Sequence, residues 1–422
     1  MGVIESLLDP IPIPHVFHAA QRFEHGRIDD VEGELDKRLG ERGVLDAVRP
    51  GARIAITVGS RGISNQPKVV RRLVERLTER GARPFVVPAM GSHGGATAEG
   101  QREMLHGMGF REDEIGCPIV SSMETVQIGT SANGLPVHID KNADGADGII
   151  LLNRIKPHVA FRGPYESGLM KMLAIGLGKQ HGADICHDLG FGKMAENIPA
   201  IGRVVLAKKN ILFAIGLIEN AYHETCRIVV LHKGEVESEE PKLQEEAKRL
   251  APRLRFSELD VLIIDEIGKN ISGTGFDTNL VGRYHTPFAS GGPSITRVSV
   301  LDLTEQSHGN ANGLGIVDFT TRRAFEKMKF DQTYPNSLTS TVPISVKIPM
   351  VLANDRQAIQ AAIKTCNILD KTKVRLVRIK NTNEIHEIEV SESLRPLVEA
   401  TDGLEAVGAS YPLGFNAEGN LF

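Results

Sequence analysis

Short apolar runs and helix-spaced apolar positions alternate along most of the chain. Residues 53–58 (RIAITV) form an apolar run, a glycine-rich turn follows, and apolar side chains then recur at helical spacing between Val69 and Leu77. A second apolar run at residues 84–90 leads into another glycine-rich turn and a helical stretch from about Ala98. This pattern predicts two successive strand, loop and helix units, which is typical of a parallel sheet.

The same alternation continues to the C-terminus. Further strands are predicted at residues 148–152, 211–218, 228–232, 259–265, 298–303, 315–319 and 374–379, and further helices at 193–206, 239–250 and 357–365. A charged stretch at 235–255 precedes the apolar run LDVLIID, so we expect a domain boundary near residue 255. The sequence predicts an α/β protein with two α/β domains, 1–255 and 256–422, built on mainly parallel sheets, with a ligand cleft between them.

Length and composition support two domains and a small-molecule partner. A chain of 422 residues that is 41% hydrophobic exceeds the length at which a single core usually divides. The formal net charge of -4 creates no general field for nucleic acid or for an anionic membrane surface, so neither is an expected partner.

Four widely spaced cysteines without a CxxC pair predict neither a disulfide framework nor a zinc knuckle, and they favour a reducing compartment. The chain also begins without a secretory signal pattern, and it contains no apolar stretch of about 20 residues. We therefore expect a cytoplasmic protein.

The first candidate for chemistry is His93, in the turn Gly91-Ser92-His93-Gly94-Gly95. Glycines let a backbone approach a ligand closely, the following helix N-terminus favours an anion, and histidine exchanges protons near neutral pH. From this segment alone, a turn in which His93 only bonds to the backbone is an equally good interpretation.

The second candidate is Lys171, within the apolar stretch LMKML. An ammonium there is paired, reaches solvent, or has a pKa low enough to react; an exposed lysine on one side of a strand or helix is the simpler alternative. His158, His181 and His187 flank this lysine, and neutral imidazole is a common ligand for nickel and zinc. These histidines follow no local zinc motif, so the segment alone does not select a metal ligand.

A third candidate is Lys269, in the loop 265–275 after the first predicted strand of the second domain. Three glycines and two hydroxyl side chains accompany Lys269, which suits the binding of a carboxylate or a phosphate. The order of residues is not that of a Walker A loop, and a structural turn is the alternative.

Taken together, these segments resemble the nickel-dependent lactate racemase family in the order of their motifs. The matching motifs are Ser60-Arg61, Gly91-Ser92-His93, Lys156-Pro157-His158, Ser167-Gly168-Leu169-Met170-Lys171 and His187. The sixteen positions from Lys171 to His187 are similar to the family's spacing between its cofactor-bearing lysine and its nickel ligand. The resemblance therefore favours His187 over His181 as the metal ligand.

The resemblance implies a nickel-pincer nucleotide, a pyridinium-3-thioamide-5-thiocarboxylic acid mononucleotide, with a thioamide link to Lys171 and nickel bound by His187. It further implies that Ser60, Arg61 and Ser167 help to bind this cofactor. By the same resemblance the N-terminal domain is catalytic and cofactor-binding, the C-terminal domain closes the substrate cleft, and separate proteins mature the cofactor.

For the reaction, the resemblance implies that His93 and His158 are paired acid and base groups on opposite faces of a 2-hydroxy acid. Arg61 and Lys269 are the expected contacts to the substrate carboxylate or to a phosphate. The predicted activity is that of a racemase or 2-epimerase, in which hydride leaves and returns to the α-carbon.

Three departures from the family pattern affect different parts of this prediction. Val58-Gly59-Ser60 precedes Arg61 without the family's aspartate, which concerns the phosphate contacts of that loop, and the thirteen positions from His158 to Lys171 are about three more than the family pattern, which concerns the link at Lys171. The chain also has no Trp to form the aromatic wall of a lactate-sized pocket, and its Lys269 loop differs in sequence, so we expect a lactate-like 2-hydroxy acid or a sugar acid rather than lactate itself. A non-catalytic nickel or nucleotide carrier is the second hypothesis, and a zinc-dependent hydrolase that uses the same histidines is the third.

Overall fold

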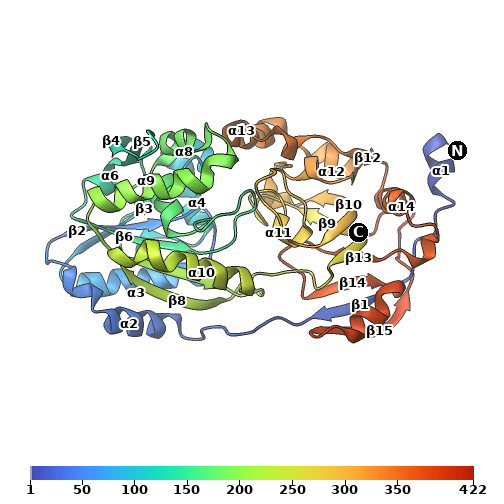
Figure 1. The fold of residues 1–422 in the computed structure, drawn as a ribbon, viewed down its shortest axis with the longest axis horizontal. Coiled ribbons are helices and arrows are strands. Elements are labelled where there is room, and N and C mark those ends of the chain that lie inside the picture. Colours follow the sequence, from blue (N-terminus) through green and yellow to red (C-terminus); the bar gives the residue numbers. More distant parts are fainter. Residues whose placement is uncertain (1) are drawn as a thin grey trace. The chain divides into compact units, whose positions relative to one another are not determined.

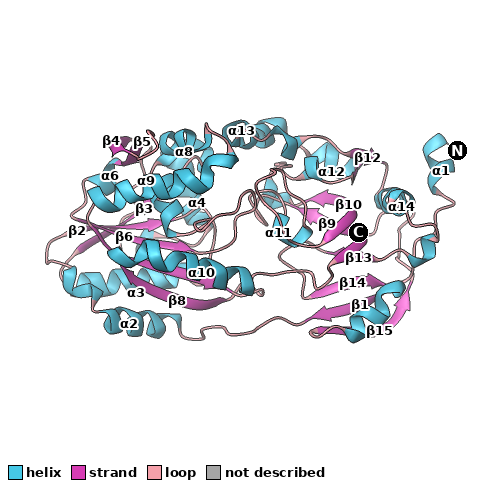
Figure 2. Cartoon of the chain, viewed as in Figure 1, coloured by secondary structure: helices cyan, strands magenta, loops and turns pink. Residues whose placement is uncertain are grey.

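Two α/β units share the chain, which the computed structural model describes over residues 2–422 (Figures 1 and 2). The N-terminal unit is Glu24–Ala251. The C-terminal unit is Pro252–Phe422 together with the residues up to Phe23. Each unit is built on a mainly parallel mixed sheet, which confirms the predicted α/β class.

The sheet of the N-terminal unit has the strand order β3-β2-β6-β7-β8. Its strands are β2 (Arg53–Val58), β3 (Arg83–Pro88), β6 (Gly148–Arg154), β7 (Ile211–Glu219) and β8 (Thr225–His232). The neighbours from β3 to β7 are parallel, and β8 is antiparallel to β7. The apolar runs in the sequence therefore predicted the positions of these five strands, because strands buried on both faces are apolar along their whole length.

The helices of this unit are α2 (Val31–Arg42), α3 (Gln66–Glu79), α4 (Ala98–Gly107), α5 (Glu112–Ile115), α6 (Lys141–Asp144), α7 (Leu169–Lys171), α8 (Lys179–His187), α9 (Met194–Lys208) and α10 (Val236–Leu250). A separate antiparallel hairpin is formed by β4 (Thr125–Thr130) and β5 (Pro136–Asp140). Between α7 and α8 the chain makes a π-helical turn, Met172–Gly176. Such turns are rare, and they occur frequently at functional sites.

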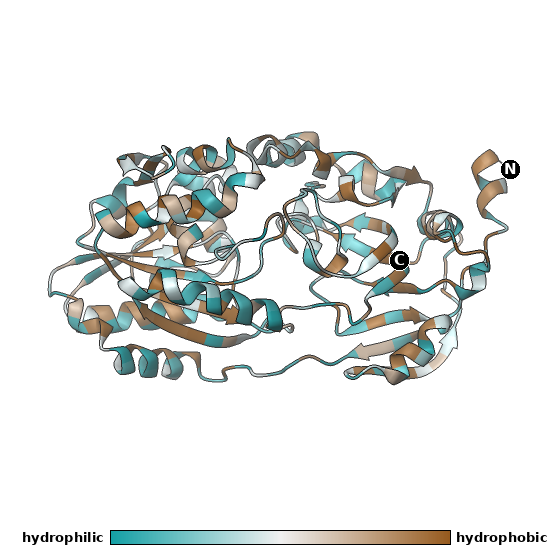
Figure 3. Cartoon of the chain, in the orientation of Figure 1, coloured by the Kyte–Doolittle hydropathy of each residue, from teal (hydrophilic) through white to brown (hydrophobic). Residues whose placement is uncertain are grey.

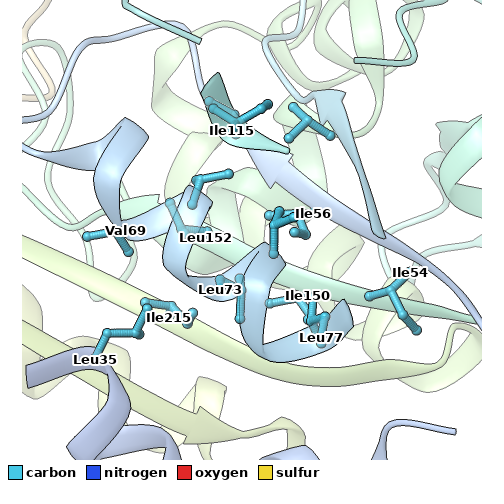
Figure 4. Packing of buried hydrophobic residues seen from close by; sticks show 14 of the residues in the cluster. Leu35, Ile54, Ile56, Val69, Leu73, Leu77, Ile115, Ile150, Leu152 and Ile215 are labelled. Carbon is cyan, nitrogen blue, oxygen red and sulfur yellow. The ribbon is translucent and has the colours of Figure 1, made fainter. Parts of the chain in front are cut away.

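The core of the N-terminal unit lies between α3 and the sheet. Figure 4 shows Leu73 and Leu77 of α3 among Ile56 of β2 and Ile150 of β6, and all four side chains are fully buried. Each fully buried side chain of this size contributes roughly 1.5–3 kcal/mol. Figure 3 shows the apolar colouring of the strands in contrast to the polar outer faces of helices such as α10. This packing fixes the sheet from which the candidate loops emerge.

The sheet of the C-terminal unit has the order β12-β11-β10-β9-β13-β14-β1-β15. Its strands are β1 (Val16–Gln21), β9 (Glu258–Ile267), β10 (Ser294–Leu303), β11 (Phe319–Thr321), β12 (Met350–Leu352), β13 (Leu376–Ile379), β14 (Glu387–Ser391) and β15 (Leu404–Tyr411). The strands from β12 to β13 are parallel, and β14, β1 and β15 continue the sheet antiparallel. Its helices are α1 (Val3–Leu8), α11 (Thr278–Val281), α12 (Arg322–Lys327), α13 (Phe330–Ser340), α14 (Asp355–Thr365) and α15 (Arg395–Ala400).

The structure differs from the expected division 1–255 and 256–422 at the N-terminus. Strand β1 is hydrogen-bonded to β14 on one side and to β15 on the other, so the first residues of the chain complete the C-terminal sheet. Phe17 is fully buried in the core of that unit, together with Leu262 and Val390. The sequence did not indicate this, because pairing between β1 and the last strands joins residues nearly 400 positions apart.

A second correction concerns residues 315–319, where a strand was predicted. The structure has a 3-10 turn at Leu314–Ile316, and the strand begins only at Phe319. Gly313 has a φ of 104°, and a Cβ at Gly315 would lie 1.9 Å from the Ile344 carbonyl oxygen. The chain therefore turns against η8 (Pro343–Val346) before it enters the sheet.

None of the helices in residues 2–422 combines the length and the apolar character needed to cross a bilayer.

The position of β1 predicts that a substitution near the N-terminus destabilises the C-terminal unit. Phe17→Ala removes a fully buried ring, and the expected loss is about 3–5 kcal/mol. Hydrogen exchange followed by mass spectrometry in increasing urea should show early loss of protection in β9 and β13, with β2 and β6 unaffected. Leu35→Ala in α2 is the matched control, and it should weaken β2 and β6 first. Early exchange of β2 and β6 in Phe17→Ala would contradict the assignment of β1.

Candidate active site

Three loops of the N-terminal unit leave the same edge of its sheet. Arg61 follows β2, His93 follows β3 and His158 follows β6. These strands are parallel and lie side by side in the order β3-β2-β6, so their carboxyl ends meet at one edge. This edge is where parallel sheets bind ligands. The structure thus brings to one sheet edge the loops of three residues that span 97 positions of the sequence, from Arg61 to His158.

The loop after β3 holds His93 in a defined orientation. Gly91, Gly94 and Gly95 all have positive φ angles, which the turn requires and which glycine adopts without strain. The Nδ1 atom of His93 lies 2.7 Å from the Met90 carbonyl oxygen. Because a carbonyl only accepts hydrogen bonds, Nδ1 carries a proton, and the neutral ring therefore has its lone pair on Nε2.

A buried carboxylate fixes the backbone of the loop after β6 at His158. Glu166 is fully buried, accepts a hydrogen bond from the His158 backbone N–H at 2.8 Å, and forms an ion pair with Lys248 at 3.0 Å. The Nδ1 atom of His158 accepts a hydrogen bond from the Ala160 backbone N–H at 3.1 Å. The neutral ring of His158 therefore carries its proton on Nε2, which is the opposite tautomer to that of His93.

Two phenylalanines pack against the histidines. The ring of His158 lies 4.5 Å from that of Phe161 and 6.1 Å from that of Phe191. Phe191 also contacts the ring of His187 edge-on, at 5.6 Å. His158 and His187 therefore lie on one aromatic cluster, although the absence of Trp had suggested that no aromatic wall would form. Sequence analysis missed both rings, and the only local signal is that a phenylalanine follows each histidine by three or four positions.

Lys171 is the last residue of α7, the first part of a helical segment that runs from Leu169 to His187. The start of this segment is held by the buried Glu240, which accepts a hydrogen bond from the Met170 N–H at 2.8 Å. Burial lowers the pKa of Lys171 to about 8, and the neighbouring guanidinium of Arg61 lowers it as well, whereas Cys186 and Glu166 oppose this shift. Within residues 2–422 the Lys171 ammonium makes no hydrogen bond or ion pair. An amine with this pKa is a suitable nucleophile or covalent anchor.

Arg61 adds a second cation to the same place. Burial lowers the pKa of Arg61 to about 10, with a further contribution from the positive charge of Arg154. Arg154 is paired with Glu219, whereas no carboxylate of residues 2–422 lies within ion-pair distance of Arg61. The loop passes close to Asn153 at Gly59, where a Cβ would lie 3.1 Å from Oδ1 of Asn153. Arg61 and Lys171 together suit a phosphate or a carboxylate.

His187 has the geometry of a metal ligand. Its Nδ1 atom donates to the Ala183 carbonyl oxygen at 2.7 Å, and burial lowers its pKa. The neutral ring therefore has its lone pair on Nε2, and a backbone bond at the other nitrogen is the usual arrangement for metal-binding histidines. His181, the alternative, is exposed and lies edge-on to His138 at 4.2 Å.

A metal at His187 needs further ligands from outside the protein chain. Across residues 2–422 there is no group of three or more His, Cys, Asp or Glu side chains that could hold a metal ion. A nucleotide that brings its own sulfur and carbon ligands fits a single histidine, and the amine of Lys171 on the same helical segment fits its attachment.

The remaining predicted residues lie in two different surroundings. Ser60 and Ser167 are half-buried in the N-terminal unit; Ser60 precedes Arg61, and the Ser167 carbonyl accepts a hydrogen bond from the Lys156 N–H at 2.9 Å. Lys269 belongs to the C-terminal unit, where its ammonium donates to the Gly273 carbonyl at 2.8 Å. Burial, together with the charge of Lys269, lowers the pKa of His285 to about 4, a neighbour that sequence analysis did not single out.

Comparison with known proteins gives one family match and a similar fold. Residues 18–196 match the profile of a family described as the lactate racemase N-terminal domain. The search of curated proteins gives no match. Among solved structures, the chain is similar to the lactate racemase apoprotein from Thermoanaerobacterium thermosaccharolyticum, with a TM-score of 0.53 and 14% sequence identity. This alignment covers 88% of the present chain and 99% of the other, and it establishes a shared fold.

The surroundings of Lys171 predict an unusually reactive amine. With a pKa of about 8, about one side chain in ten is neutral at pH 7, against roughly one in a few thousand for an ordinary lysine. The rate of acetylation of Lys171, measured by peptide mass spectrometry, should rise with pH and level off above a midpoint near 8. Arg61→Ala removes a positive neighbour and should move this midpoint upward. A midpoint near the value of ordinary lysines in the unmodified protein would contradict the described surroundings.

Proposed function

We propose that the protein is a racemase or 2-epimerase of a 2-hydroxy carboxylic acid, because residues 18–196 match the profile of the lactate racemase N-terminal domain family. The observation that carries the proposal is the pair His93 and His158. The two histidines emerge from one sheet edge with opposite neutral tautomers, beside the helical segment of Lys171 and His187. Inversion at an α-carbon needs one acid and one base, and this pair can supply both.

The cofactor that we propose is the nickel-pincer nucleotide of the family. His187 would provide one nickel ligand through Nε2, Lys171 the attachment, and Arg61, with Ser60 and Ser167, contacts to the nucleotide. When bound, this cofactor supplies an acceptor and donor of hydride for the substrate α-carbon. The lowered pKa of the Lys171 amine and the lone pair on Nε2 of His187 support this assignment.

The histidines manage the protons of the reaction. For one enantiomer, Nε2 of His93 takes the hydroxyl proton as the α-carbon becomes planar. For inversion, the substrate oxygen then receives a proton from His158, which therefore begins this step as an imidazolium. Because both nitrogens of an imidazolium carry protons, Nδ1 of His158 must leave the Ala160 N–H in that state, and it accepts this hydrogen bond again when the ring is neutral. The opposite enantiomer uses the same steps in reverse. The pair thus shares one extra proton, and either two or no extra protons stop the reaction.

The substrate carboxylate needs a cation, and Arg61 is the proposed contact in the N-terminal unit because no carboxylate of the described chain neutralises it. Lys269, in its glycine-rich loop, is the second proposed anion contact. Phe161 and Phe191 replace a Trp as the apolar surface near His158. Because this aromatic surface lacks the family's Trp, we propose a lactate-like acid or a sugar acid as the substrate. Lactate itself is one member of the panel to be tested.

The proposal predicts isomerisation by the matured protein. After co-expression with cofactor-maturation proteins, the chain should contain nickel and should racemise or epimerise at least one member of a panel of enantiopure 2-hydroxy acids. The dependence of kcat/KM on pH should be bell-shaped, because the histidine pair needs one extra proton. His93→Ala and His158→Ala should each lower kcat by about 10²–10⁴-fold, as expected for a general acid or base.

His181→Ala is the matched control, because the same change is made at an exposed histidine of α8, and it should leave the rate unchanged. Matured protein that holds nickel and nucleotide but isomerises no acid of the panel would contradict the proposal and support the carrier hypothesis. Metal-balanced expression tests the zinc hydrolase hypothesis, which zinc bound in place of nickel would support.

A further inference from the structure

We propose that Lys179 and Gln101 are positioning residues that fix the His93 loop onto the helix ending at His187. The inference rests on the proposed function, because it concerns the catalytic geometry of that same site. Neither residue belongs to the motifs that the sequence analysis singled out, and neither is a candidate contact to substrate or cofactor.

Lys179 is a lysine without any exposed surface. It is the first residue of α8, and its φ of 55° is unusual for a residue other than glycine. Its ammonium donates hydrogen bonds to the Pro88 carbonyl oxygen at 2.7 Å and to Oε1 of Gln101 at 2.6 Å. Pro88 is the last residue of β3, so this bond joins the start of α8 to the point where the His93 loop begins.

Gln101 continues the connection into the loop itself. This fully buried side chain of α4 donates from Nε2 to the Gly91 carbonyl at 2.9 Å and to the His93 carbonyl at 3.1 Å. An ammonium can only donate hydrogen bonds, so the amide of Gln101 must turn its oxygen toward Lys179. Its two N–H groups then necessarily point to the loop. The lysine thus determines which way the glutamine faces.

The other side of the ammonium faces a buried acid. The Lys179 ammonium nitrogen lies 3.6 Å from Oδ2 of Asp140, and this oxygen has no hydrogen bond. The other carboxylate oxygen, Oδ1, accepts hydrogen bonds from the backbone N–H groups of Asn142 and Ala143. Burial lowers the pKa of Lys179 to about 8 and raises that of Asp140. An apolar side chain of the same shape usually stabilises a core at least as well as a buried ion pair. The specific bonds therefore point to a geometric role.

Further backbone contacts show what this geometry fixes. The Gly91 N–H donates to the Gly176 carbonyl of the π-helical turn at 3.3 Å, and a Cβ at Gly91 would lie 3.5 Å from the Ala183 methyl group. Ala183 is the residue whose carbonyl orients His187. The His93 loop is thus held at Pro88, Gly91 and His93 against the same helix that carries the proposed nickel ligand. A displacement of about 1 Å in such an arrangement can cost about 10²-fold in rate.

Gln101→Glu tests this role with little change in shape. Glutamate keeps an oxygen acceptor for Lys179, but it replaces the two N–H donors by an oxygen that faces two carbonyl oxygens. In protein without cofactor, hydrogen exchange of residues 89–97 should accelerate by about tenfold or more, with β2 and β6 unchanged. In matured protein, kcat should fall by about 10²-fold while nickel content and KM stay the same.

Gln360→Glu is the matched control. Gln360 is a buried glutamine of the C-terminal unit whose amide donates to the Ile11 carbonyl at 3.1 Å, so the same change removes a similar bond elsewhere. It should leave the exchange of residues 89–97 and the kcat unchanged. If Gln101→Glu does not yield folded protein, Lys179→Met, which removes the donor and keeps the length of the side chain, should produce the same local acceleration and the same loss of kcat.

Three results would overturn the inference. These are unchanged exchange in residues 89–97, faster exchange throughout the N-terminal sheet, or a fall in kcat matched by an equal loss of nickel. If the unsubstituted matured protein isomerises nothing, the proposed function fails. Faster hydrogen exchange confined to residues 89–97 in Gln101→Glu would still show that Gln101 fixes the His93 loop. The two failures are therefore distinguishable.

Discussion

The parallel alignment of β3, β2 and β6 is the constraint on which the candidate site depends. Because the three strands run in the same direction and are neighbours, the loops with His93, Arg61 and His158 must leave one edge of the sheet. The core between α3 and the sheet makes this edge rigid. The helical segment from Lys171 to His187 contacts the same loops through Gly59 and Gly91, where side chains would not fit easily.

Buried polar groups hold the loops at this edge of the sheet in position. Glu166 binds the backbone at His158, Glu240 binds the first turn before Lys171, and Lys179 with Gln101 binds the loop of His93. A buried polar group is costly unless it is hydrogen-bonded, so each of these groups stabilises one arrangement of backbone atoms and disfavours displacement. Arg61 and Lys171 are the opposite case, since the described residues give neither of them an anionic partner within bonding distance. The first set of groups therefore positions the backbone of the site, whereas Arg61 and Lys171 are the groups available to bind an anionic ligand.

Local pattern predicted much of the fold, because strands buried on both faces are recognisable as apolar runs. The strand predicted at 53–58 coincides with β2, and the helix predicted at 357–365 lies within α14. Strand β1 was missed because its partners come from the opposite end of the chain, and β4 was missed because it is partly exposed and polar. The strand expected at 315–319 was wrong because tertiary contacts at Gly315 override the apolar pattern.

For the site, sequence order placed the motifs that carry His93, His158, Lys171 and His187, and the structure brings their loops and helix together in one unit. The supporting residues were not predictable, since Gln101 and Lys179 meet across 78 positions and Glu240 reaches Met170 across 70. The role of Phe191 was not predictable, because its ring meets that of His158 across 33 positions of the sequence. Lys269 lies in the C-terminal unit, where its proposed part in substrate binding rests on the chemistry of its loop.

The proposed function requires that one helical segment attach the cofactor at Lys171 and bind its nickel at His187. Intact-mass measurement of the matured protein, with peptide mapping and metal analysis, tests both roles. We expect a nucleotide adduct on the peptide that contains Lys171, and we expect nickel to be lost in His187→Ala and retained in His181→Ala. Attachment at a different lysine, or full nickel content in His187→Ala, would contradict it.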